Sequence, residues 1–129
     1  MKSSASSEPL LPQRLDLGIG SASGHRVYWN GRCLVWQRTS AAGDVLDEVE
    51  LQPSEAAWRE FWRELDQLGV WNWEAYYEPE YPTCGGTQWG VWIERGDRLL
   101  KSSGRDAWPP RFSDFLSAIR RLIENLPFD

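Results

Sequence analysis

The sequence predicts an α+β fold in which one antiparallel sheet of about five strands carries two amphipathic helices on one of its faces. Three observations lead to this expectation. The first is periodicity: short segments alternate apolar and polar residues as strands do, and two longer segments repeat apolar residues at helical spacing. The second is the order of these segments, which is strands, helix, strands, helix. The third is composition: the 129 residues include 9 tryptophans, whose large rings supply much of the apolar surface that a core needs.

The first group of strands contains the clearest local pattern. Asn30 and Gly31 separate two segments rich in β-branched and aromatic residues, and this pair is typical of a type I′ hairpin turn because both residues tolerate positive φ. Farther along, apolar residues alternate with acidic ones, which predicts that Val45, Val49 and Leu51 face the core. Leu46, Glu48 and Glu50 are expected to face away from it. The strands expected here are residues 14–19, 25–29, 32–38 and 44–51.

The first helix is expected to begin after Pro53-Ser54 and to end at Leu68. Gly69 follows as a left-handed C-cap, and Val70 completes the apolar contact that usually accompanies such a cap. One face of the helix gathers the large apolar residues, which are Trp58, Phe61, Trp62, Leu65 and Leu68.

The second half of the chain repeats this layout. In residues 87–94 the side chains of Trp89, Val91 and Ile93 share one face and Trp92 takes the other. A turn then leads to a strand over 98–103. The final helix carries one apolar stripe, made by Phe112, Phe115, Leu116, Ile119, Leu122, Ile123 and Leu126.

Residues 14–129 are expected to form a single domain, preceded by a flexible tail over the Ser- and Pro-rich residues 1–13. The net charge is −5 and the basic residues are scattered, whereas nucleic acids and anionic membranes bind clustered Lys and Arg. Neither is therefore expected as a partner. No apolar run reaches the length of a signal peptide or membrane span, so the expected location is the cytoplasm.

Cofactors are not expected either. Cys33, Cys84 and His25 are too few for a structural zinc site and are widely spaced. A disulfide between the two cysteines is an alternative to two free thiols, but a domain of this size has enough core without it.

Three kinds of chemistry are weaker interpretations of particular residues. Glu74, Glu78 and Glu80 provide carboxylates for glycoside hydrolysis, but nothing sets their spacing. Cys84 lies beside two glycines and has only His25 as a base. Residues 101–105 combine two cations with small residues, without the strand–loop–helix order of a phosphate-binding loop. An enzyme is therefore not expected.

The segment after the first helix is aromatic and acidic, contains prolines, and lacks a clean period. Trp and Tyr are enriched at interface hot spots because each combines an apolar body with a hydrogen-bonding tip. The alternative is that these rings pack back onto the sheet as a second cluster. The candidate binding residues are Trp71, Trp73, Tyr76, Tyr77, Glu78 and Tyr81.

Several motifs together resemble a family of small, uncharacterised bacterial proteins, and this resemblance covers residues from about 27 to 126. The resemblance implies an α+β fold and brings no activity with it. The sequence departs from the family at Gly85, where Asp is usual, and at Arg105, where Asn or Ser is common. The matching motifs are Trp58-x-x-Phe61, Leu68-Gly69-Val70-Trp71-x-Trp73, Gly86-Thr87-Gln88-Trp89, Lys101-Ser102-Ser103-Gly104 with Pro109, and Phe112-x-x-Phe115.

The sequence thus favours a noncatalytic, cytoplasmic binding protein that uses an aromatic and acidic surface to bind another protein. The glutamates between the rings would suit a basic partner. Immunity and inhibitor proteins act through surfaces of this kind. The first alternative is a module that binds a sugar or a cationic small molecule, and a small hydrolase is the second.

Overall fold

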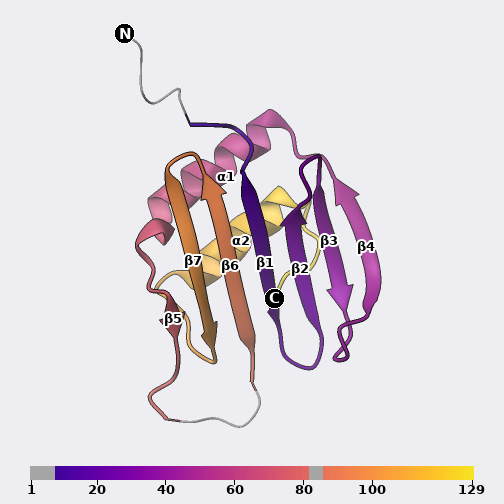
Figure 1. The fold of residues 1–129 in the computed structure, drawn as a ribbon, viewed down its shortest axis with the longest axis vertical. Helices are drawn as coiled ribbons and strands as arrows, with labels where there is room; N and C mark the ends of the chain where they lie inside the picture. Colours follow the sequence, from indigo (N-terminus) through magenta and orange to yellow (C-terminus); the bar gives the residue numbers. More distant parts are fainter. Residues whose placement is uncertain (1–7, 82–85) are drawn as a thin grey trace.

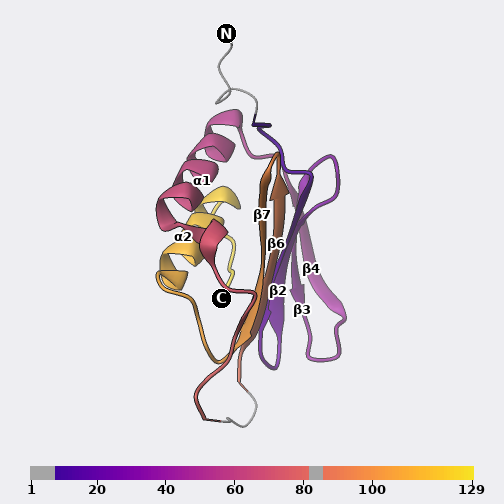
Figure 2. The ribbon, with the colours of Figure 1, turned by 60° about the vertical axis from the view of Figure 1, so that its left-hand side comes forward.

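The computed structural model describes residues 8–81 and 86–129. It is an α+β structure with two layers, a seven-stranded sheet and two helices that lie on the same face of it (Figures 1 and 2). The α+β class and the placement of both helices on one face were predicted from the sequence. Within the described residues, no helix is long and apolar enough to cross a membrane.

The strands lie side by side in the order β4-β3-β2-β1-β6-β7-β5. Strand β1 occupies the centre and pairs antiparallel with both β2 and β6. The elements are β1 Arg14–Gly20, β2 Gly24–Trp29, β3 Leu34–Thr39, β4 Val45–Leu51, α1 Glu55–Leu68, the 3-10 helix η2 Val70–Asn72, β5 Tyr76–Tyr77, β6 Gln88–Arg95, β7 Arg98–Arg105 and α2 Phe112–Leu122.

The expected sheet of about five antiparallel strands is only roughly right, because the sheet has seven strands and is mixed. Strand β5 pairs in parallel with β7, and the backbone N–H of Ser103 donates to the carbonyl of Ala75 at 3.1 Å. This strand has two residues and lies in the aromatic segment that has no alternating pattern. Its extended conformation comes from pairing with a distant strand, which local periodicity does not report.

The hairpin at Asn30 and Gly31 forms, but its turn is not the predicted two-residue type. Trp29 pairs with Leu34, so four residues connect the strands, and only the glycine has positive φ. The side-chain carbonyl of Asn30 instead accepts hydrogen bonds from the N–H groups of Arg32 and Cys33, at 2.8 and 2.9 Å. Asn30 therefore stabilises the turn through its side chain.

The prediction that Val45 faces the core is wrong, since 51% of this residue is exposed. Arg38 pairs with Asp47 and Thr39 with Val45, so Leu46 is an extra residue on β4. Such a bulge interrupts the alternation on which the prediction rested.

The core lies between the sheet and the helices. Both helices bury most of the stripe that their sequences predict, and Trp58, Trp62 and Trp89 are buried as expected. Leu68, Leu116 and Leu126 of the predicted stripes are only partly buried. Helix α1 begins at Ser54, whose hydroxyl accepts from the N–H of Ala57, and ends at Gly69 in the left-handed conformation. Helix α2 is shorter than predicted, because the chain turns away through positive φ at Glu124 and Asn125.

Residues 8–13, which were expected to belong to a flexible tail, lie against α1 and the β6–β7 hairpin. The indole N–H of Trp62 donates to the carbonyl of Leu10 at 2.7 Å, and Arg95 donates to the carbonyl of Pro9 at 2.6 Å. Arg95 also lies over the Trp62 ring, 4.6 Å from its centre. These contacts attach the start of the described chain to one end of the two layers.

Replacing Leu65, which is fully buried on α1, by Ala is expected to lower the free energy of unfolding by about 2–5 kcal/mol, because it leaves a cavity. Gln67→Ala, at an exposed position of the same helix, is expected to change it by less than about 0.5 kcal/mol. Urea unfolding followed by tryptophan fluorescence measures both. Equal effects of the two substitutions would contradict the assigned helix face.

Candidate functional site

The structure divides the six predicted binding residues between the core and the surface. Trp73 and Tyr77 join an aromatic group on the core side, here called the α2 cluster, with Trp89, Phe112 and Phe115. The centre of the Trp73 ring lies 5.1 Å from that of Phe115, and the Tyr77 ring lies 6.0 Å from Trp89. These two residues therefore pack against the sheet and α2, as the alternative interpretation expected.

Trp71 is half-buried and held at its polar end. Its indole N–H donates to a carboxylate oxygen of Asp66 at 2.7 Å, and Arg98 lies over its ring at 5.5 Å from the centre. A ring fixed in this way links the end of α1 to β7. Trp71 therefore connects these two elements and does not offer a free ring for binding.

Tyr76, Glu78 and Tyr81 are the predicted residues that reach the surface. Tyr76 is 51% exposed and Tyr81 is 73% exposed, while Glu78 is also exposed. Tyr76 pairs with Ser103 of β7, and its side chain points away from the core, opposite to that of its neighbour Tyr77. It therefore lies on the face of the sheet that no helix covers, called the open face below.

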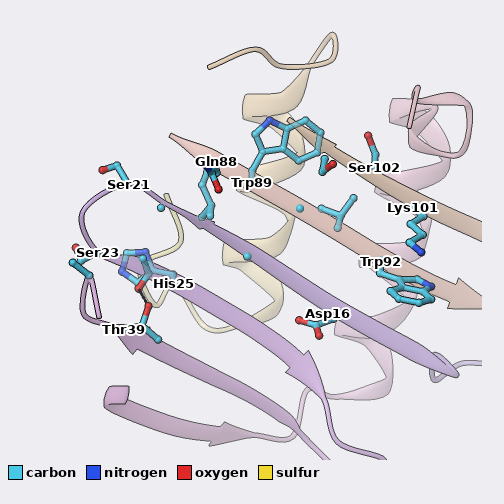
Figure 3. A pocket seen from close by; sticks show the side chains of 18 of the residues that line it. Asp16, Ser21, Ser23, His25, Thr39, Gln88, Trp89, Trp92, Lys101 and Ser102 are labelled. Carbon is cyan, nitrogen blue, oxygen red and sulfur yellow. Dashed lines mark hydrogen bonds between the residues drawn. The ribbon is translucent and has the colours of Figure 1, made fainter. Parts of the chain in front are cut away.

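The open face has a shallow hollow of about 760 Å³ that lies over β1, β6 and β7 and reaches the β1–β2 and β3–β4 turns at one end of the sheet (Figure 3). In Figure 3 Trp92 and Lys101 project from this face, whereas Trp89 and Ser102 project from the opposite one. Glycines of β1, β2 and β6 line the hollow, and Ala75, next to Tyr76, lies at its border. The other labelled lining residues with short or polar side chains on this side are Asp16, Ser21, Ser23, Thr39 and Gln88.

Two glycines in the hollow are not required to be glycine by any contact with the described residues. Gly18 and Gly90 are directly paired in adjacent central strands, and neither has positive φ. A Cβ atom added to either would meet no atom closer than 3.9 Å. Glycine inside a strand weakens it and often marks a place where another molecule approaches the backbone closely. We call these two residues the glycine pair.

Neighbouring glycines provide the contrast. A Cβ atom on Gly20 would lie 2.5 Å from the carbonyl oxygen of Ser23, and one on Gly24 would lie 2.7 Å from that of Ile19. These two glycines are required by the tight connection between β1 and β2. The glycine pair is not required in this way.

Charged residues border the hollow and fix its aromatic ring. The indole N–H of Trp92 donates to Glu94 at 2.7 Å, and the cationic groups of Arg14 and Lys101 lie over the ring, 4.1 and 4.0 Å from its centre. Each such contact stabilises the ring position by an amount on the order of 0.5–1 kcal/mol at an exposed site. Trp92 is therefore a rigid part of the rim.

On the other side of the hollow, Arg26 binds Asp16 with two hydrogen bonds, 3.0 and 2.8 Å long. These hydrogen bonds raise the pKa of the Arg26 guanidinium above its ordinary value. The guanidinium also lies over the ring of Tyr28, 4.2 Å from its centre. The pair forms a second ordered part of the rim.

The glycine pair was not recognised as a candidate site in the sequence, although a signal was present. Gly18 alternates with apolar residues inside a predicted strand, and Gly90 lies between Trp89 and Val91 in another. An isolated glycine in a strand pattern suggests a bulge or a close approach. Only the pairing of β1 with β6 shows that the two positions are adjacent.

The residues considered for nucleophilic catalysis lie only partly within the described part of the chain. The possible disulfide and the Cys84 nucleophile lie outside the described residues. His25 stacks on Trp36, with 5.9 Å between ring centres, and its Nδ1 lies 3.2 Å from the backbone oxygen of Asp129. Residues 8–81 and 86–129 contain no group of three His, Cys, Asp or Glu side chains able to hold a metal ion.

Trp73→Ala is expected to lower the free energy of unfolding by about 3–5 kcal/mol, because its ring packs in the α2 cluster. Tyr76→Ala is expected to change it by less than about 0.5 kcal/mol, since Tyr76 is half exposed. Thermal and urea unfolding of the two variants give the comparison. A stable Trp73→Ala variant would return this residue to the list of surface candidates.

Gly18→Ala and Gly90→Ala are each expected to stabilise the fold by about 0.5–1 kcal/mol, because a methyl group fits and the unfolded chain loses freedom. Gly104→Ala is the matched control on β7 and is expected to destabilise the fold, since its Cβ would lie 2.6 Å from the Trp89 ring nitrogen. The free energy of unfolding is measured for all three. Destabilisation by the first two would mean that the fold itself needs these glycines.

Comparison with known proteins does not assign the chain to a family. No protein-family model matches the chain, and no curated protein matches it significantly. The resemblance to small bacterial α+β proteins therefore stays an expectation.

Proposed function

We propose that the protein is a noncatalytic binding protein whose partner is another protein that docks on the open face of the sheet. The glycine pair is the observation that carries this proposal. Gly18 and Gly90 leave two central strands without side chains at one point of an uncovered face, and no contact within residues 8–81 and 86–129 requires this. A partner that packs against the exposed backbone there explains why both positions are glycine.

The shape of the hollow favours a protein over a small molecule. Small-molecule sites are usually clefts that enclose most of their ligand. The hollow is shallow and open across the sheet, so it suits a protrusion of a larger partner. Flat or weakly concave surfaces of this kind gain affinity from a few anchoring side chains at their centre.

The aromatic ring of the rim also argues against the sugar-binding alternative. A sugar-binding tryptophan stacks a free ring face against its ligand. The ring of Trp92 already lies close to two cationic groups, those of Arg14 and Lys101. A sugar would have to displace these contacts.

Tyr76, Glu78 and Tyr81 extend the proposed surface beyond the hollow. Tyr76 lies on the open face beside β7, and the three residues are exposed. Exposed tyrosines next to a glutamate suit a partner with basic groups, because cations bind both carboxylates and aromatic rings. An inhibitor or immunity protein in the cytoplasm needs only a preorganised surface such as this one.

Photo-crosslinking in the cell of origin tests the proposal. A benzophenone amino acid replaces Tyr76 on the open face or, as a matched control, Arg59 on the exposed side of α1. The Tyr76 position is expected to give a specific cross-linked protein that the Arg59 position does not give. The second step adds Gly90→Val, which fills the hollow, and is expected to reduce the cross-link by at least about tenfold.

Gln67→Ala, which changes only an exposed helix position, is the control for the second step. The proposal is contradicted if the cross-link forms equally from Arg59. It is also contradicted if Gly90→Val leaves the cross-link from Tyr76 unchanged while the variant remains folded.

A further inference from the structure

Strand β4 is an edge of the sheet whose pairing groups are open on one side. It is hydrogen-bonded to β3 alone, and Figure 1 shows it at the border of the sheet. Four consecutive residues, 45–48, are exposed, so this part of the strand is uncovered on both faces. Val45 and Leu46 are about half exposed, at 51% and 50%. Alternate N–H and C=O groups of such an edge are free to bind another strand.

The edge is also strongly acidic. Residues 39–54 contain Asp44, Asp47, Glu48 and Glu50 and no Lys or Arg. Arg38 on β3 neutralises Asp47 through an ion pair of 2.5 Å. The carboxylate of Glu48 accepts a hydrogen bond from the neutral Gln37 at 2.6 Å, which leaves its charge in place. Among the described residues, neither Glu48 nor Glu50 forms an ion pair with a basic side chain.

From the open edge, the exposed aliphatic residues and this charge, we propose that β4 accepts an extended, basic segment of a partner protein as an eighth strand. The segment pairs through its main chain with residues 47–51, beyond the bulge at Leu46. Its alternate basic side chains lie beside Glu48 and Glu50, and its apolar side chains lie on the opposite face, that of Val49. Strand addition of this kind takes affinity from main-chain hydrogen bonds and specificity from the alternating side chains.

The same charges disfavour a second copy of this chain on the same edge. Two β4 strands paired antiparallel would bring Glu48 and Glu50 close to the glutamates of the other copy. Like charges on opposed strands destabilise the pairing. The acidic edge thus favours pairing with a basic strand over pairing with β4 of a second copy of the chain. Residues 47–51 do not line the open-face hollow, so the inference does not depend on the proposed function.

The probe is a blocked seven-residue peptide, Lys-Val-Lys-Val-Lys-Val-Lys, added to the full chain labelled with ¹⁵N. We expect chemical shift changes concentrated in residues 45–51 and slower hydrogen exchange of the outward β4 amides. Glu50→Lys is expected to weaken binding by roughly tenfold, because an attraction becomes a repulsion. Asp97→Lys, in the exposed turn between β6 and β7, makes the same change in net charge and is expected to leave binding unchanged within about twofold.

Two N-methylated peptides separate strand pairing from simple charge attraction. One carries N-methyl groups on its valines and the other on its interior lysines. In a paired strand only one of these two sets of N–H groups faces β4. One peptide is therefore expected to lose binding by at least tenfold and the other to retain it.

Several results would overturn the inference. These are equal binding of both methylated peptides, an equal effect of Asp97→Lys and Glu50→Lys, and shift changes centred away from β4. The absence of any β4 shift at millimolar peptide would overturn it as well. If Glu50→Lys does not fold, a double variant with Glu48→Gln and Glu50→Gln is the milder substitute. It is also expected to weaken peptide binding.

Discussion

Leu15, Leu17 and Ile19 of β1 lie in the core beneath the helix layer, and much of the remaining structure follows from their burial. Successive side chains of a strand point to opposite faces. Once these three residues face the helices, Asp16 and Gly18 must face the other way. Because β1 is central and pairs with both β2 and β6, its register sets which residues of the neighbouring strands reach the open face. The core therefore determines the position of the glycine pair.

The aromatic residues show how the same short segment serves the core and the surface. Trp73 and Tyr77 pack into the α2 cluster, and the hydroxyl of Tyr77 accepts a hydrogen bond from the backbone N–H of Glu74 at 2.9 Å. The hydroxyl of Ser102 donates to the carbonyl of Glu74, which ties the segment to β7. These contacts hold Tyr76 in an ordered exposed position. A ring presented from a fixed backbone loses less entropy on binding than one on a mobile loop.

Charge distinguishes the two proposed surfaces. Around the hollow, positive and negative groups are largely paired with each other, as Arg26 is with Asp16. Along β4 the carboxylates of Glu48 and Glu50 have no such counterpart among the described residues. Binding at the hollow would therefore depend on shape and on close approach to the backbone, whereas binding at the β4 edge would depend on charge and main-chain pairing. One partner covering both would need an apolar or aromatic protrusion and a basic extended segment.

Local sequence determined the elements whose stabilising contacts are local. The amphipathic stripes of the two helices, the Gly69 cap, and the alternation of β1 and β6 all depend on residues a few positions apart, so they were predicted directly. Tertiary structure alone decided that β5 pairs in parallel with β7, that Trp73 packs half-buried in the α2 cluster, and that β4 contains a bulge at Leu46. It also decided that Gly18 lies beside Gly90, since strands far apart in the chain become neighbours only through the hydrogen bonds and packing of the complete sheet. The tryptophans in the sequence therefore predicted an aromatic core. The position of the glycine pair on the open face depended on how that core brought the strands together.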